Sequence, residues 1–142
     1  MRILALDVGE RRVGVAVSDL TGTIARPLYA IRRASRAEDF AAIADLVEEY
    51  QAEAVVVGQP LSLDGHAGPQ ARRVARYADA LAESLTVPVI PSDERFSTAR
   101  ADEILRETRG ERAKRRARAN GEIDAIAAAV ILQRYLDSER GD

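Results

Sequence analysis

The sequence has no cysteine, no tryptophan and a single histidine among its 142 residues. The absence of cysteine excludes a disulfide framework and any zinc site built on thiolates. No apolar run approaches the ~20 residues needed to span a bilayer, and no signal-peptide pattern precedes the first strand, so we expect a cytoplasmic protein without a membrane partner. Aromatic residues make up only 4% of the chain. Stacking platforms for single strands are therefore not evident, and any nucleic acid should be recognised by its backbone and shape.

The formal net charge is −2, which argues against a protein that simply coats nucleic acid. The arginines are clustered, however, and a cluster is what matters for contacts with phosphates. The length is that of one ordinary domain with a real core, so we expect residues 1–142 to form a single domain.

Two short apolar runs open the chain and flank a turn that contains glycine and arginine, a pattern that predicts a β-hairpin over residues 3–19. Asp7 ends the first run after four consecutive apolar residues. Burying this carboxylate without a partner would be costly, so it should meet a cation, a metal ion or hydrogen-bond donors. We expect Gly9 and Gly14 to let the backbone pass close to whatever binds there. The plain alternative is a turn aspartate that closes a strand.

The rest of the chain predicts a mixed sheet covered by helices, an α/β layered domain with strand order 3-2-1-4-5. Pro27 marks an edge strand over residues 23–31, and prolines mark the last strand, residues 87–91, as the other edge. A capping box at Ser35 and a proline at position 69 predict two helix starts. The remaining expected elements are a buried strand over residues 54–57, a short helix around Ile104 and Leu105, and a final helix from about Glu122 to Leu136.

Two further acidic positions stand out beside Asp7. Asp124 falls inside the apolar face of the final helix, where a structural salt bridge to a core arginine is the alternative to a functional role. Asp93 and Glu94 follow the last strand, and a solvated turn is the alternative there. In such sheets ligands bind outside the carboxyl ends of the strands. A carboxylate cluster without histidine or cysteine suits Mg²⁺ or Mn²⁺, and two such ions can support phosphodiester hydrolysis.

Basic residues could hold the polyanion that such a site needs. We interpret the segment from Arg109 to Arg118 as a flexible phosphate-contacting arm, with a solvated helix extension as the alternative. Arg11 and Arg12 are candidates for backbone contacts beside Asp7. The helix that starts at Pro69 carries three arginines that we expect on its solvated face. His66 is expected to be an exposed loop residue. The candidate phosphate ligands of the arm are Arg112, Lys114, Arg115 and Arg116.

Four blocks of the sequence stand out in order: residues 7–16 with 18–19, 57–60 with 64–65, 93–98, and 124–129 with 131–132. Together they resemble the YqgF/RuvX family, which is described both as Holliday junction resolvases and as pre-16S rRNA nucleases. The resemblance spans nearly the whole chain and is specific as a set. It departs from the better-known resolvases in that the strand over residues 54–57 ends in Gly58-Gln59 and not in an acid, so the second carboxylate must come from one strand further on.

This resemblance implies a ribonuclease H-like fold and a divalent-metal-dependent nuclease, with Asp7, Glu94 and Asp124 as the catalytic and metal-binding acids. Arg95 would be a phosphate-binding or structural partner, and Asp93 a neighbour of the site. The implied cofactor is Mg²⁺ or Mn²⁺ and the implied partner is structured RNA or branched DNA. We favour processing of the 5′ end of pre-16S rRNA by a monomer or homodimer. Holliday junction resolution, which favours a two-fold symmetric dimer, and a non-catalytic nucleic-acid-binding module are the alternatives.

Overall fold

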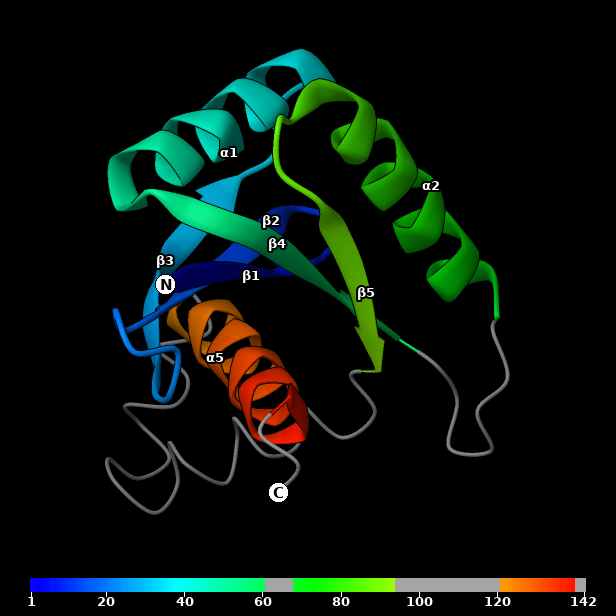
Figure 1. Cartoon of the computed structure of the whole chain (residues 1–142). Coiled ribbons are helices and arrows are strands. Elements are labelled where there is room, and N and C mark those ends of the chain that lie inside the picture. The colour runs from blue at the N-terminus through cyan, green and yellow to red at the C-terminus, as the bar shows by residue number, and fades with distance from the viewer. Residues whose placement is uncertain (61–67, 94–120, 140–142) are drawn as a thin grey trace.

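Five strands and three helices make up the part of the chain that the computed structural model describes, residues 1–60, 68–93 and 121–139. In chain order they are β1 (Arg2–Val8), β2 (Arg12–Ser18), β3 (Ala25–Arg32), α1 (Arg36–Tyr50), β4 (Ala52–Gln59), α2 (Pro69–Ser84), β5 (Val89–Asp93) and α5 (Glu122–Glu139) (Figure 1).

The strands form one mixed sheet in the order β3-β2-β1-β4-β5, as the sequence predicts. β1, β2 and β3 pair antiparallel, whereas β4 and β5 continue the sheet parallel to β1. The two strands marked by proline lie at the two edges of the sheet. Pro27 lies opposite Ala16, next to an irregularity in the register between β2 and β3. This placement is what the missing N–H of proline requires.

The predicted helix starts are also confirmed. The Ser35 hydroxyl accepts a hydrogen bond from the Glu38 backbone N–H at 3.1 Å, which caps α1. α1 ends at Tyr50, and the next residue, Gln51, has a left-handed backbone (φ 52°) that leads the chain directly into β4. Pro69 occupies the first turn of α2, where its missing N–H has no helical partner to lose.

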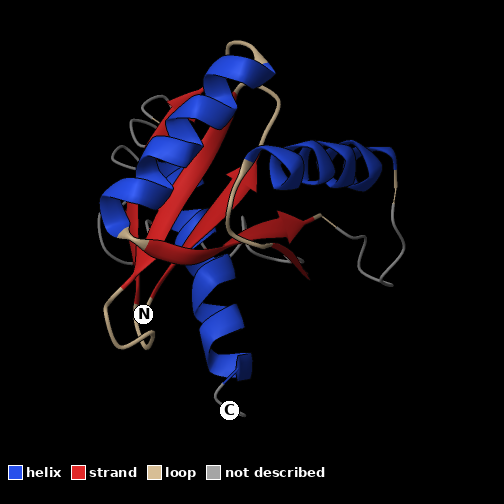
Figure 2. Cartoon of the chain, turned by 45° about the horizontal axis from the view of Figure 1, so that its top comes forward, coloured by secondary structure: helices blue, strands red, loops and turns tan. Residues whose placement is uncertain are grey.

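The sheet lies between two helical layers, with α1 and α2 on one face and α5 on the other (Figures 1 and 2). Alternation along β1 decides which side chain meets which layer. Leu4, Leu6 and Val8 belong to the core under α1 and α2. Ile3 and Ala5 belong to the smaller core under α5. Asp7, two residues after Ala5, therefore lies on the α5 face.

Several predicted features fall outside the described residues: the short helix around Ile104, the basic arm and the loop with His66. Within residues 1–60, 68–93 and 121–139, no helix is long and apolar enough to cross a membrane.

Candidate metal-binding active site

Asp7 lies near the carboxyl end of β1 and is half-buried. Its cross-strand partner is Gly14 of β2. Directly opposite residues of an antiparallel pair have their Cα atoms about 5 Å apart. Whatever covers Gly14 on the α5 face therefore also comes close to Asp7.

The first turn of α5 covers Gly14. A Cβ atom at position 14 would lie 2.0 Å from the backbone carbonyl oxygen of Asp124. That distance is too short for any side chain to be accommodated there. The register of the hairpin and the docking of α5 thus bring the backbone at Asp124 close to the strand position of Asp7, although the two residues stand near opposite ends of the sequence. The predicted convergence of these two acids is consistent with this arrangement.

The expectation that both glycines make room for a ligand is wrong, because the groups that approach them belong to the chain itself. At Gly14 the approaching group is the α5 backbone. At Gly9 an added Cβ would lie 2.9 Å from the Arg12 carbonyl oxygen, which also accepts a hydrogen bond from the Gly9 N–H at 2.9 Å. Gly9 therefore serves the tight turn between β1 and β2.

One carboxylate oxygen of Asp124, Oδ2, is buried without a hydrogen-bond partner among the described residues. The compensation for its charge is an ion pair with Arg12, whose Nε lies 3.1 Å from Oδ2. Burial raises the pKa of Asp124 above its usual range, although the neighbouring Arg12 guanidinium acts in the opposite direction.

Arg12, expected to contact a nucleic-acid backbone, thus lies against Asp124. The pair resembles the salt-bridge alternative considered for Asp124, but the arginine is not a core residue: the Arg12 and Asp124 side chains are 38% and 28% exposed. Arg11 is exposed on the same turn, where it remains a candidate for phosphate contacts.

The third predicted acid, Glu94, follows directly after β5 in the sequence. β5 ends with Asp93, which pairs with Gln59 of β4. Because β1, β4 and β5 run parallel, their carboxyl ends lie on the same side of the sheet. Glu94 and Arg95 lie outside the described residues, as do Arg112 and Lys114 to Arg116. Within the described ranges, no group of three or more acidic or histidine side chains could hold a metal ion.

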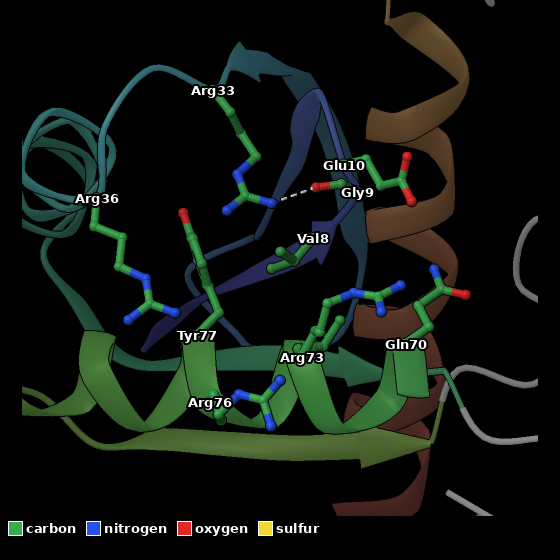
Figure 3. Close-up of a pocket in the computed structure, with 10 residues that line it drawn as sticks. Val8, Gly9, Glu10, Arg33, Arg36, Gln70, Arg73, Arg76 and Tyr77 are labelled. Carbon is green, nitrogen blue, oxygen red and sulfur yellow. Dashed lines mark hydrogen bonds between the residues drawn. The ribbon is translucent and has the colours of Figure 1, made fainter. Parts of the chain in front are cut away.

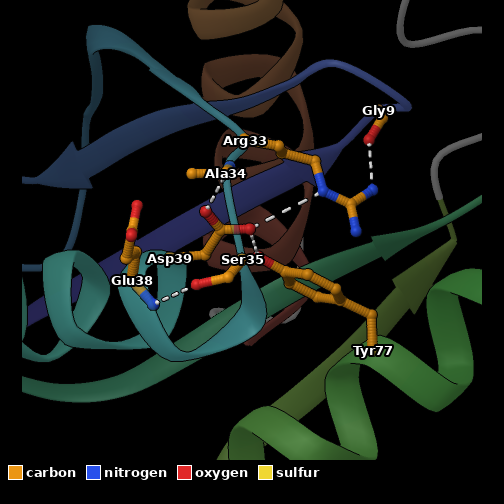
Figure 4. A network of polar contacts seen from close by, with 7 residues as sticks. All are labelled: Gly9, Arg33, Ala34, Ser35, Glu38, Asp39 and Tyr77. Carbon is orange, nitrogen blue, oxygen red and sulfur yellow. Dashed lines mark hydrogen bonds and ion pairs between the residues drawn. The ribbon is translucent and has the colours of Figure 1, made fainter.

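Sequence reasoning missed Arg33, which fixes the turn after Asp7 from the opposite face of the sheet (Figure 4). Its Nη1 donates a hydrogen bond to the Gly9 carbonyl oxygen at 2.8 Å, and its backbone N–H donates to the Arg11 carbonyl oxygen at 2.8 Å. Its Nε lies 3.7 Å from Asp39, a carboxylate that is only 3% exposed. An arginine two residues before a capping serine gives no local signal for this role.

A five-stranded mixed sheet in this order, covered by helices on both faces and bearing carboxylates beside its central strand, defines a protein of the ribonuclease H-like class. The chain belongs to the RuvX family, described as Holliday junction resolvase, whose model matches residues 1–138. The predicted family resemblance is confirmed.

Curated relatives cover nearly the whole chain. A protein of Thermoanaerobacter pseudethanolicus is 43% identical over 141 residues, 99% of both chains, and one of Chloroflexus aurantiacus is 46% identical over 140 residues, 99% of this chain and 89% of the relative. Both bear the name "Putative pre-16S rRNA nuclease".

Solved resolvase structures share the fold. Thermus thermophilus RuvC in complex with a Holliday junction substrate has a TM-score of 0.60 at 18% identity, over 99% of this chain and 96% of that one. The fowlpox virus Holliday junction resolvase has a TM-score of 0.55 at 15% identity, over 97% and 99% of the two chains. These likenesses confirm the predicted ribonuclease H-like fold.

Proposed function

We propose that this protein is a divalent-metal-dependent nuclease that hydrolyses phosphodiester bonds in structured nucleic acid, with the 5′ end of pre-16S rRNA as its substrate. The observation that supports the proposal is that the first turn of α5, which carries Asp124, packs against Gly14, the cross-strand partner of Asp7. Two carboxylates are held on one face at the end of the central strand, and one of them has a buried oxygen that no described residue satisfies with a hydrogen bond.

This donor set fits a hard divalent cation. Carboxylate oxygens are the ligands that Mg²⁺ and Mn²⁺ prefer, and the chain has no cysteine that would favour a softer metal. Asp7, Asp124 and Glu94, which follows β5 directly in the sequence, would hold the ion. A divalent ion bound there would supply an activated water and stabilise the oxygen that leaves.

The chain's own residues prepare this chemistry. The hairpin register and the α5 contact fix the two carboxylates on rigid elements, so little conformational freedom is lost when a cation binds. A divalent cation bound there would replace Arg12 as the partner of the Asp124 carboxylate. Arg11 and Arg12, on the turn next to the two acids, would then contact substrate phosphates.

The substrate assignment to ribosomal RNA is supported by the names of the full-length relatives. The family description and the likeness to RuvC favour Holliday junction DNA as the second candidate. Junction resolution would call for a two-fold symmetric dimer, whereas trimming of an RNA end would not.

The test is the substitution Asp7→Asn, assayed on precursor 16S rRNA ends and on four-way DNA junctions with Mn²⁺, with Mg²⁺ and with chelator. We expect hydrolysis to fall at least about 100-fold, because a carboxylate ligand is lost. Binding of the nucleic acid in the absence of a metal should persist. Asp79→Asn, at an exposed position of α2, is the matched control and should leave the rate unchanged.

The outcome also separates the classes of function. Hydrolysis of the RNA alone supports the rRNA role, and hydrolysis of the junction alone supports the resolvase role. A wild-type protein that binds nucleic acid but hydrolyses neither substrate with either metal would instead be a non-catalytic binding module, and the proposal would be wrong.

A further inference from the structure

A pocket of about 220 Å³ opens on the face of the sheet opposite to α5. It lies between the start of α1 and the first turns of α2, beside the turn that joins β1 to β2 (Figure 3). Val8 and Tyr77 contribute buried apolar surface to it. The proposed function makes no use of this pocket, because Asp7 and Asp124 lie on the other face.

Four arginines and one glutamate line the pocket. Arg33 and Arg36 approach it from the side of α1, while Arg73 and Arg76 approach it from α2 (Figure 3). The Glu10 carboxylate lies to the side of the pocket, away from the guanidinium groups of Arg33 and Arg36 (Figure 3). The charge of the lining is therefore strongly positive.

The four arginines differ in how they are held. Arg33 is fixed by its hydrogen bond to Gly9, its ion pair with Asp39 and its position over the Tyr77 ring, 4.8 Å from the ring centroid. The other three side chains are exposed, and no ion pair neutralises them within the described ranges. The pocket is thus lined by one guanidinium group that is held in place, that of Arg33, and by three without an ion pair among the described residues.

Such an arrangement favours an anionic ligand. Like charges that share a site repel one another, and a bound anion relieves that repulsion. The planar fork of a guanidinium group matches phosphate oxygens in bidentate geometry, which makes arginine the common phosphate ligand in proteins.

The position of the pocket indicates which phosphate it takes. Its lining begins at Val8 and Gly9, one and two residues after Asp7, which corresponds to about 3–7 Å along an extended strand. Three of its four arginines, Arg36, Arg73 and Arg76, are exposed, so the pocket is accessible from solvent. A nucleic acid bound at the acids could therefore extend around the β1–β2 turn and reach the arginines.

We propose that this pocket is an anchoring site for the phosphodiester backbone of the nucleic-acid substrate, away from the bond that is cleaved. The assignment rests on the proposed function only for the identity of the polymer. It adds a binding site formed by Arg36, Arg73 and Arg76 around the pinned Arg33. This site holds a backbone phosphate and takes no part in the chemical step.

The test compares two double variants that each remove two positive charges. Arg73→Gln with Arg76→Gln alters the pocket. Arg26→Gln with Arg72→Gln alters two exposed arginines, on β3 and α2, that do not line it. Binding to a labelled precursor 16S rRNA fragment is measured in EDTA between about 50 and 200 mM salt, the range over which phosphate contacts dominate the salt dependence.

For the pocket variant we expect the slope of log K against log salt to flatten by about one to two, with about a tenfold loss of affinity at the lowest salt. The control variant should keep the slope of the wild type. Equal slopes for all three proteins, or equal flattening in both variants, would overturn the proposal. Thermal unfolding followed by circular dichroism establishes that each variant is folded.

A second pair of probes separates a backbone phosphate from a terminal one. The pocket variant should lose the same affinity for RNA with a 5′-phosphate and for RNA with a 5′-hydroxyl. A loss confined to the 5′-phosphorylated RNA would contradict a backbone site. Because no metal is present in these measurements, their result is independent of whether Asp7→Asn abolishes hydrolysis.

Discussion

The two faces of the sheet are built differently at the carboxyl end of β1. On the α5 face, β1 and β2 carry the small residues Ala5, Gly14 and Ala16. The first turn of α5, which carries Asp124, therefore packs directly against the backbone of the sheet. On the α1 and α2 face the side chains are large, and Phe40 packs edge-on against Tyr77 with 5.1 Å between ring centroids.

The charges follow the same division. The close-packed face carries the pair of acids, whereas the bulky face carries the arginine-lined pocket. The β1–β2 turn joins the two, with Asp7 before it and the Arg33 contact to Gly9 behind it. The proposed cation site and the proposed phosphate site therefore lie on the two sides of a single turn of the chain.

The close approach of α5 is where we expect the largest effect on stability. Gly14→Ala would force the Asp124 carbonyl oxygen away from a Cβ atom 2.0 Å distant, and the whole first turn of α5 would have to move. We expect the free energy of unfolding to fall by about 3 kcal/mol, measured by urea denaturation. Hydrolysis should fall as well, because Asp124 moves with the helix.

Gly68→Ala is the matched control for this substitution. An added Cβ there meets nothing within 4 Å. The weaker helix cap and the lower entropy of the unfolded chain offset each other, so the change should be within about 0.5 kcal/mol. Equal losses at positions 14 and 68 would contradict the close packing of α5.

The bulky face depends instead on its buried polar network. Asp39 accepts hydrogen bonds from the Ala34 backbone N–H at 3.0 Å and from the Tyr77 hydroxyl at 3.4 Å, and it pairs with Arg33 (Figure 4). Asp39→Asn keeps an acceptor for the backbone but removes the charge. We expect the free energy of unfolding to fall by about 1–2 kcal/mol, less than for a fully buried pair because Arg33 is partly exposed.

Asp45→Asn, at an exposed position of the same helix, should change the free energy of unfolding by no more than about 0.5 kcal/mol. Equally small losses from both substitutions would contradict a stabilising role for the Asp39 network.

The smallest expected effect is a dependence on alkaline pH. Burial, followed by the nearby Asp39 charge, raises the pKa of Tyr77 from 10.0 to about 12. The folded state therefore retains this proton after the unfolded state has lost it. The stabilisation is fully present below pH 10, the ordinary pKa, and is lost as the pH rises toward 12.

Tyr77→Phe removes this proton and should therefore be less sensitive to that pH range than the wild type. Urea midpoints of the two proteins at several pH values in this window provide the comparison. A constant difference between them across the window would contradict the pKa shift.

Much of this contrast could be predicted from local sequence patterns. The prolines predict both sheet edges, Ser35 and Pro69 predict two helix starts, and the apolar surroundings of Asp124 predict that it faces the sheet. These signals are local, since each depends on a few neighbouring residues. Family resemblance then connected Asp7 with Asp124.

The parts that could not be predicted depend on contacts between distant segments. Glu38 and Asp39 look alike at the start of a helix, yet only Asp39 is buried, because Arg33 and Tyr77 surround it. Arg73 and Arg76 are exposed, as expected for a solvated helix face, but their place in a shared pocket follows from the docking of α2 beside α1. Likewise, no pattern in β2 indicates that the group that approaches Gly14 is a helix from the other end of the chain.

Titration with Mn²⁺ by calorimetry tests the central claim most directly, because it asks whether Asp7 and Asp124 form one cation site. The wild type and Asp79→Asn should bind the ion with the same affinity. Asp7→Asn and Asp124→Asn should each weaken binding by at least about tenfold. Equal Mn²⁺ affinity in all four proteins would show that these carboxylates do not bind the metal, and would contradict the account.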